Sequence, residues 1–215
     1  MSTRSAVEFW RALAHLVVLR PLVKLLYGVR VTGGGHLRHL DHYIIIANHN
    51  SHLDILLLFY LLPLGHIART HAVAEEEYFS RSRIVFRLVR FLFQPLWVRR
   101  GEASTQHDPL QEIRRRLDAG HNIIVFPEGT RGKPGALEHF KSGIGRLIAE
   151  YPGIPVVPVF LVGPERALPK SRALLLPFLC SVRVGPPRTW SGPHRDITRG
   201  LEDQFTFLAH VATSR

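Results

Sequence analysis

Three short runs of almost wholly apolar residues constrain the fold of this chain more than any other feature. They span residues 43–47, 122–126 and 155–162, and each is short and rich in Ile or Val. Such runs are typical of strands that are buried on both faces, as in a parallel sheet covered by helices. Helix candidates alternate with them along the chain. The sequence therefore predicts one α/β domain with a mostly parallel central sheet flanked by helices.

The segments between these runs have helical patterns, and two further short strands are expected. The predicted helices span residues 53–62, 108–119, 142–150 and 201–212, and the further strands residues 71–74 and 182–184. Pro155 and Pro158 lie in the third apolar run. They predict that this strand is at an edge, contains a bulge, or does not need all of its N–H groups.

Charge and cysteine content narrow the class of protein. The chain has 215 residues, which suits one domain, and 28 Lys plus Arg against 17 acidic residues give a net charge of +11. This excess favours an anionic partner: a nucleic acid, a membrane surface or a phosphorylated substrate. A nucleic acid is disfavoured because no DNA- or RNA-binding motif is present and the charge is spread along the chain. Cys180 is the single cysteine, so an internal disulfide is excluded and a reducing compartment is expected.

Three stretches have a composition that favours contact with a membrane. No run of 18 apolar residues exists, so we predict no conventional spanning helix. Residues 7–27 and 83–98 combine apolar and basic residues, which is typical of helices that lie at an anionic bilayer surface. Residues 55–64 are nearly all apolar but too short to span, and a buried helix is expected there. The alternative is that all three pack on the protein's own sheet.

These patterns divide the chain into two parts. Residues 1–28 are predicted to form an amphipathic, membrane-associating helix, and residues 29–215 a single α/β domain. No secretory signal is expected, because Glu8 and Arg11 interrupt the apolar N-terminal stretch.

A histidine and a carboxylate follow the first apolar run at short spacing. His49 and Asp54 are five positions apart, which on one helix would place them about 140° away from a shared face. They can meet if His49 lies in the loop after the strand and Asp54 in the first turn of the next helix. Asp54 would then orient one imidazole nitrogen, and the other nitrogen would accept a proton from a substrate hydroxyl.

Other interpretations of this segment remain open. Ser51-x-x-Asp54 is also a capping-box pattern, in which Asp54 only satisfies backbone donors. His49 and His52 have a spacing that could serve a metal, but no third ligand at a recognised spacing accompanies them, and no metal is expected. Ser51 is the minority candidate for a nucleophile, and Cys180 lies outside any nucleophile motif.

A turn with anion-binding groups follows the second apolar run. Gly129 permits a positive φ or a close approach of the backbone to a ligand. The Thr130 hydroxyl and the Arg131 guanidinium suit a phosphate, which arginine can hold with two hydrogen bonds. Lys141, at the start of the next predicted helix, could add a second positive charge. The alternative is an ordinary solvated turn, in which Glu128 also has no special role.

These motifs together resemble the conserved sequence blocks of the glycerolipid acyltransferases, the lysophosphatidate acyltransferase family. The resemblance covers roughly residues 29–190, and the blocks occur in the expected order. They are Asn48-His49-x-x-x-x-Asp54, Phe126-Pro127-Glu128-Gly129-Thr130-Arg131, Phe140-Lys141-Ser142-Gly143 and Ile154-Pro155-Val156-Val157-Pro158-Val159.

The resemblance implies a glycerol-3-phosphate acyltransferase-like fold and an O-acyltransferase activity. The acyl group would pass from acyl-CoA or acyl-carrier protein to the free hydroxyl of a lysophospholipid, foremost 1-acyl-glycerol-3-phosphate, giving phosphatidate. His49, oriented by Asp54, would act as the general base, and Glu128 would orient the acceptor or Arg131. No cofactor is expected, and the location would be the cytoplasmic face of a membrane, with peripheral or monotopic attachment.

The second block of the family is altered in this chain. Glu75 stands where the family commonly has a lysine, and Arg99 stands in place of an aspartate, while Arg100 matches the family's arginine. The resemblance implies that Arg100 and Arg131, assisted by Lys141, hold the acceptor phosphate. The altered block leaves the acceptor head group open.

Two rival functions use the same residues. A catalytically silent lipid-binding protein would keep the fold without turnover. A hydrolase would use His49 and Asp54 to release free fatty acid from the thioester without any acceptor.

Overall fold

The computed structural model describes residues 3–51, 53–75, 82–98, 110–129, 139–163 and 178–213. Its strands form a seven-stranded sheet in the order β1-β7-β6-β2-β5-β3-β4. Among the described strands, only β6 and β7 pair antiparallel, and all other neighbours are parallel. The strands are β1 (Tyr27–Thr32), β2 (Ile44–Ala47), β3 (Thr70–Glu75), β4 (Leu96–Val98), β5 (Asn122–Val125), β6 (Val156–Val162) and β7 (Phe178–Val184).

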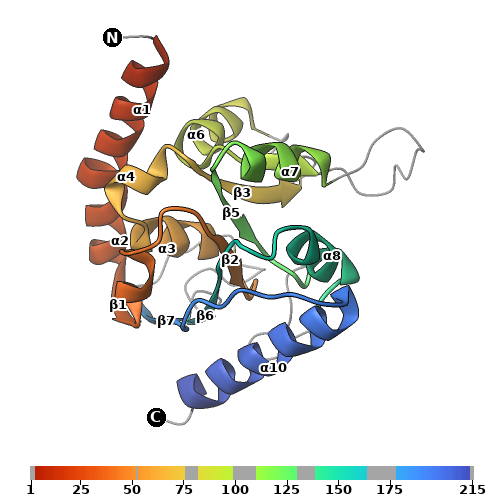
Figure 1. The fold of residues 1–215 in the computed structure, drawn as a ribbon. Helices are drawn as coiled ribbons and strands as arrows, with labels where there is room; N and C mark the ends of the chain where they lie inside the picture. The colour runs from red at the N-terminus through yellow and green to blue at the C-terminus, as the bar shows by residue number, and fades with distance from the viewer. Residues whose placement is uncertain are drawn as a thin grey trace.

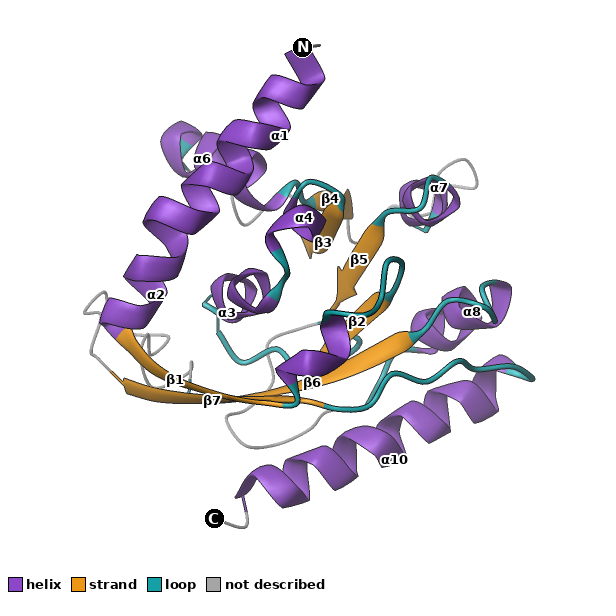
Figure 2. Ribbon diagram, turned by 60° about the vertical axis from the view of Figure 1, so that its left-hand side comes forward, coloured by secondary structure: helices purple, strands orange, loops and turns teal. Residues whose placement is uncertain are grey.

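Helices cover both faces of this sheet (Figure 1). The N-terminal helical run packs on one face with α3, α4 and α6, and α7, α8 and α10 cover the other (Figure 2). The helices are α1 (Thr3–Ala14), the π-helical segment η1 (His15–Leu19), α2 (Arg20–Leu26), the 3-10 turn η2 (Gly34–Leu37), α3 (Asp54–Leu61), α4 (Leu64–Ile67), α6 (Arg83–Phe93), α7 (Gln111–Asp118), α8 (Ser142–Glu150) and α10 (His194–Thr213).

Strand β2 lies in the middle of the sheet, and this position explains why its sequence is apolar throughout. Ile45 and Ala47 pack into the cluster under the N-terminal helices and α3, whereas Ile44 and Ile46 pack into the cluster under α7, α8 and α10. Successive side chains of a strand point to opposite faces, so a strand covered on both sides has no polar position. The predicted single α/β domain with a mostly parallel sheet is confirmed.

The third apolar run forms an interior strand, so its prolines do not mark an edge. Pro158 pairs with Ile46 of β2 on one side. On its other side the antiparallel ladder with β7 ends at the pair Val159 and Val184, and the Gly185 amide donates to the Pro158 carbonyl. Pro158 therefore lies beyond the regular ladder, where a strand can dispense with an N–H group.

The predicted helix over residues 83–98 is wrong in its last five residues. Helix α6 ends at Phe93, because Gln94 adopts a left-handed conformation with φ 45° and Pro95 follows. Residues 96–98 then form the edge strand β4. Strand β1 and the first residues of β7 were not expected from the sequence either.

The N-terminal helical run is fastened to the domain by three side chains that donate to carbonyl groups at helix ends. Arg11 Nε donates to Phe91 O at 2.6 Å and His15 Nε2 to Leu92 O at 2.9 Å, both near the end of α6. Arg20 Nη2 donates to the carbonyl of Leu62, which follows α3, at 2.6 Å. These groups satisfy carbonyls that the helices leave unpaired. The boundary after residue 28 stays a prediction.

Within the part of the chain that the structure describes, no helix is both long and apolar enough to cross a bilayer. Contact of residues 7–27 and 83–98 with a membrane surface stays a prediction.

Candidate active site

The candidate site lies where the parallel strands β2 and β5 end side by side. Ile46 of β2 pairs with Val125 of β5, so the segments that follow the two strands emerge at one edge of the sheet. The first segment carries His49 and Asp54, and the second carries Glu128 and Gly129. This edge, at the carboxyl ends of strands, is where α/β sheets commonly bind ligands.

His49 and Asp54 are in contact, as their spacing predicts. His49 lies in the loop after β2 and Asp54 is the first residue of α3. His49 Nδ1 is 2.9 Å from Asp54 Oδ2. The Asp54 side chain is fully buried, whereas the His49 side chain is 22% exposed. The pair thus joins a buried carboxylate to an imidazole that solvent or substrate can reach.

Asp54 also shapes the loop that carries the histidine. Its Oδ2 atom accepts hydrogen bonds from the amides of Asn50 at 2.6 Å and Ser51 at 2.8 Å. A capping box is not formed, because Leu53 is the N-cap of α3 and the Ser51 hydroxyl accepts from the Leu53 amide rather than from Asp54. The same oxygen thus contacts the imidazole and two backbone amides, so Asp54 does more than satisfy backbone donors, while its part in catalysis stays a prediction.

The His49 ring has a fixed orientation. It stacks on Phe126, with 4.3 Å between ring centroids and 26° between planes. Because Nδ1 faces a carboxylate, that nitrogen carries the proton and Nε2 is left as the basic nitrogen. Among the described residues, Nε2 has no hydrogen-bond partner. Its place is open to an incoming hydroxyl.

Glu128 and Asn48 hold the backbone around His49. Glu128 is almost completely buried, and its Oε1 lies 3.4 Å from the His49 amide, which donates to it. Asn48 pairs with the backbone of Leu161 in β6: its amide donates to the carbonyl at 2.9 Å and its oxygen accepts from the N–H at 2.7 Å. Neither contact was expected from the sequence, although Asn48 and Phe126 both belong to the motifs.

Gly129 and Lys141 are also brought together. Gly129 has φ 70°, as the turn required, and its amide donates to Phe126 O. The Lys141 side chain passes so close that a Cβ at position 129 would lie 2.8 Å from Nζ and 2.6 Å from Cε. The Lys141 amide donates to Pro127 O at 3.0 Å. Glycine at this position thus lets a cation lie against the turn.

Three of the predicted site residues, Arg100, Thr130 and Arg131, lie outside the described residues, as does His52. In the described part of the chain, no three His, Cys, Asp or Glu side chains are arranged to hold a metal ion.

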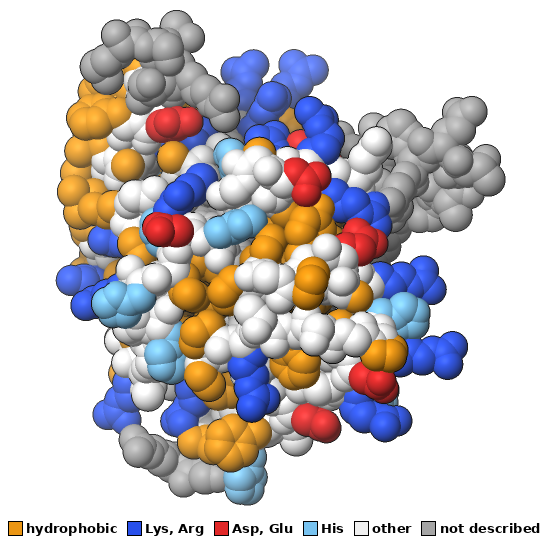
Figure 3. All heavy atoms as spheres, viewed as in Figure 1, with side chains coloured by type: hydrophobic (Ala, Val, Ile, Leu, Met, Phe, Trp, Pro, Cys, Tyr) orange, Lys and Arg blue, Asp and Glu red, His pale blue; other side chains and the backbone are white. Residues whose placement is uncertain are grey.

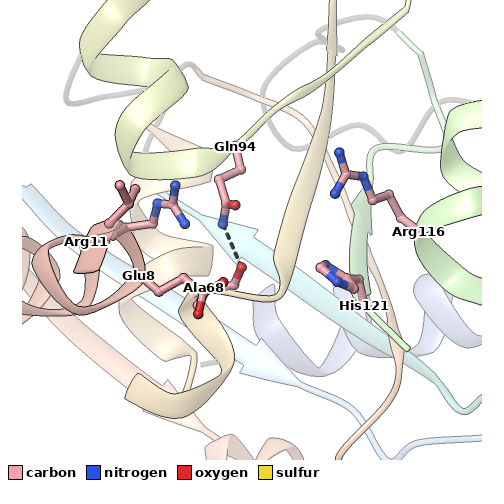
Figure 4. A pocket seen from close by; sticks show the side chains of 7 residues that line it. Glu8, Arg11, Ala68, Gln94, Arg116 and His121 are labelled. Atoms are coloured by element: carbon pink, nitrogen blue, oxygen red, sulfur yellow. Dashed lines mark hydrogen bonds between the residues drawn. The ribbon is translucent and has the colours of Figure 1, made fainter. Parts of the chain in front are cut away.

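A cavity of about 340 Å³ lies at the opposite edge of the sheet (Figure 4). Glu8 and Arg11 of α1 line it on one side, and Arg116 of α7 and His121, just before β5, on the other. Because His121 precedes β5 whereas the candidate site follows it, this cavity is separated from His49 by the length of the strand. The cavity is not lined by His49, Asp54, Glu128, Gly129 or Lys141.

Comparisons with known proteins find a matching family and several similar proteins. A family model described as Acyltransferase matches residues 28–162. The 1-acyl-sn-glycerol-3-phosphate acyltransferase alpha of Ovis aries is 28% identical over 200 residues, which cover 90% of this chain and 67% of that protein. The 1-acyl-sn-glycerol-3-phosphate acyltransferase of Cocos nucifera is 31% identical over 145 residues, covering 67% of this chain and 45% of that protein.

A solved structure has the same fold. The crystal structure of the 1-acyl-sn-glycerophosphate (LPA) acyltransferase PlsC from Thermotoga maritima superposes with a TM-score of 0.81 and 22% sequence identity. The superposition covers 100% of this chain and 85% of that chain. At this level of identity the likeness shows the fold alone.

Proposed function

Because this chain belongs to the glycerolipid acyltransferase family and is an O-acyltransferase, we propose that it acylates the free hydroxyl of 1-acyl-glycerol-3-phosphate. The acyl donor is acyl-CoA or acyl-carrier protein, and the product is phosphatidate. The observation that carries the proposal is the contact of 2.9 Å between His49 Nδ1 and the buried Asp54 carboxylate. No cofactor enters the reaction.

In the proposed reaction His49 is the general base. Its Nε2 takes the proton of the acceptor hydroxyl while that oxygen attacks the thioester carbonyl of the donor. The tetrahedral intermediate then expels the thiolate, which receives the proton back from the imidazolium. Asp54 stabilises the imidazolium that forms between these two steps. The products are an ester and a free thiol, and no acyl-enzyme is formed.

The acceptor phosphate is held beside this base. Lys141, which lies against the Gly129 turn, provides one positive charge, and Arg131 and Arg100 provide two more. The buried Glu128 contributes by holding the His49 amide. Charged donors of this kind suit a phosphate because the hydrogen bonds are charge-assisted.

The chain is proposed to act as a peripheral or monotopic protein at the cytoplasmic face of a membrane. Hydrophobic side chains gather along the edge formed by α1 and α2 (Figure 3). Trp10, Val18 and Leu25 on this edge are 60%, 61% and 81% exposed, and Ile84 at the start of α6 is 81% exposed. Apolar residues on a basic helix favour a position at an anionic bilayer surface.

The function is tested with purified protein, labelled long-chain acyl-CoA or acyl-carrier protein, and a panel of lysophospholipids. We expect acylated lysophosphatidate, and we expect His49→Gln to reduce turnover by about 10²- to 10⁴-fold without changing the melting temperature by more than a few degrees. Substantial turnover by His49→Gln would rule out the general base. If only another lysolipid is acylated, that lysolipid is the acceptor and lysophosphatidate is not. If the thioester is consumed without an acylated product, the protein is a hydrolase.

Arg131→Ala provides a second test, aimed at the phosphate. Its KM for lysophosphatidate should rise far more than its KM for the acyl donor. Equal changes in both constants would contradict a role in holding the acceptor.

A further inference from the structure

A second hollow, larger than the cavity in Figure 4, lies between the N-terminal helical run and the end of α3. Its volume is about 760 Å³, which is within the range of sites for small ligands. The floor and walls are mostly apolar and include Leu16, Val31 and residues 60–64. We refer to this hollow as the lipid groove.

The groove has a strongly one-sided charge. Arg20, Lys24 and Arg38 line it, and the described lining includes no Asp or Glu. Arg20 is committed to the Leu62 carbonyl. Lys24 and Arg38 are exposed, and neither forms a salt bridge with any described residue. A pair of uncompensated cations at the rim of an apolar hollow suits a ligand with an anionic head and an apolar tail.

The groove adjoins the exposed apolar edge of the molecule, because Leu16 lines the groove and is itself 46% exposed. Arg20 and Lys24 are one helical turn apart, so they lie on one flank of the N-terminal run. Val17 and Leu25 on the outer face of the same run are 60% and 81% exposed. If this edge lies on a bilayer, a lipid of that bilayer can enter the groove without leaving the membrane.

The groove is separate from the candidate active site. His49 contacts Asp54 at the first residue of α3, whereas the groove is lined by residues that end α3 and follow it. Eight helical residues span about 12 Å. We therefore infer that a head group held by Lys24 and Arg38 lies beyond hydrogen-bonding distance of His49, and that a lipid in the groove is not the reacting acceptor.

From these observations we propose that the lipid groove binds one anionic phospholipid of the bilayer, which is not a substrate in that position. Its phosphate lies between Lys24 and Arg38, and an acyl chain lies along the apolar floor. The bound lipid fixes how the protein sits on the membrane. This inference rests on the proposed membrane association, but it does not depend on acyl transfer.

The first test measures binding to vesicles. The full chain is sedimented with phosphatidylcholine vesicles, with and without a minor fraction of phosphatidylserine, an anionic phospholipid that is neither the proposed acceptor nor the proposed product. We expect the double variant Lys24→Gln, Arg38→Gln to lose its preference for the anionic vesicles, by about fivefold for each charge removed. The matched control is Arg195→Gln, Arg199→Gln on α10, which removes two exposed charges from the other face of the sheet and should keep the preference. If both double variants lose the preference for anionic vesicles equally, the proposed lipid site at Lys24 and Arg38 is overturned.

The second test blocks the groove without changing its charge. Val31 lies on the edge strand β1 and is 38% exposed, so Val31→Trp should fill the groove while the strand is kept. We expect this variant to lose the preference for the anionic vesicles by several fold. Binding equal to that of the parent chain would overturn the proposal that an acyl chain occupies the groove.

Two controls separate the alternatives. Lys24→Arg, Arg38→Lys keeps the charges and should keep the preference, and a melting curve for each variant shows that it is folded. Soluble glycerol 3-phosphate should not displace the protein from vesicles. Displacement would indicate that the groove binds a soluble phosphate and would overturn the proposal that it binds a lipid. Both tests measure binding. If the protein shows no acyl transfer, the proposed function is overturned, but the proposal for the lipid groove is not affected.

Discussion

Oδ2 of Asp54 lies 2.9 Å from Nδ1 of His49, and the same oxygen accepts hydrogen bonds from the amides of Asn50 and Ser51. One buried atom therefore builds the loop and orients the imidazole. The two roles can be separated by substitution, because an amide oxygen can replace the carboxylate for the loop but brings no charge to stabilise an imidazolium.

Asp54→Asn should therefore reduce kcat strongly with little change in stability. We expect a loss of about 10²- to 10⁴-fold in kcat, measured with saturating acceptor, and a melting temperature close to that of the parent. Asp54→Ala should in addition leave the amides of Asn50 and Ser51 buried and unpaired, at about 1–3 kcal/mol each in the free energy of unfolding. Near-normal turnover by Asp54→Asn would refute its part in orienting and charging His49.

Gly129→Ala should weaken binding of the acceptor. The new Cβ would meet Lys141 and push its ammonium away from the turn, while the positive φ costs about 1–2 kcal/mol. Gly120→Ala is the matched control, since Gly120 has φ 75° and open space around it. Both variants should lose similar stability in urea, but only Gly129→Ala should raise KM for the acceptor. A parallel rise in both would assign the effect to backbone strain.

Asn48→Ala should destabilise the domain and loosen the site together. It removes both hydrogen bonds to Leu161, so a buried N–H group in β6 loses its acceptor. We expect about 1–3 kcal/mol less free energy of unfolding in a urea titration and a lower kcat. An unchanged midpoint for Asn48→Ala would contradict this account.

Stability should decline with acid because of a buried histidine. Burial lowers the pKa of His71 from 6.5 to about 4. The unfolded chain therefore binds the proton first, so this contribution is complete above pH 6.5, is lost as pH falls, and stops changing below pH 4. The loss is about 3 kcal/mol for this group. His71→Asn, which keeps a donor for the Gln94 carbonyl, should show a flatter dependence of unfolding free energy on pH between 7 and 4.

The sequence predicted the centre of the sheet better than its edges. Strands β2, β5 and β6 are covered on both faces, so each is a continuous apolar run. Strand β1 lies at one edge, where Gly28 and Arg30 are exposed, and β4 at the other edge has three residues. Neither has a pattern of its own. A strand that is half-covered or very short is specified by its neighbours, which a single sequence does not reveal.

The candidate site divides in the same way. The contact of His49 with Asp54 depends on local geometry over five residues, so its spacing was sufficient to predict it. The bond of Asn48 to Leu161 joins residues 113 apart in sequence and needs β2 and β6 to be neighbours. The packing of Lys141 against Gly129 likewise depends on how α8 returns to the turn. Such contacts follow from topology, which local patterns do not determine.

The three bonds that fasten Arg11, His15 and Arg20 to the ends of α6 and α3 have a consequence for reach. A helix fastened at three points cannot swing like a tether, so its depth in a bilayer also sets the height of His49 above the lipid head groups. Under the proposed membrane association, only a hydroxyl at that height meets the base. The protein would thus select lipids by the depth of their free hydroxyl in the membrane, in addition to any contact of its side chains with the head group.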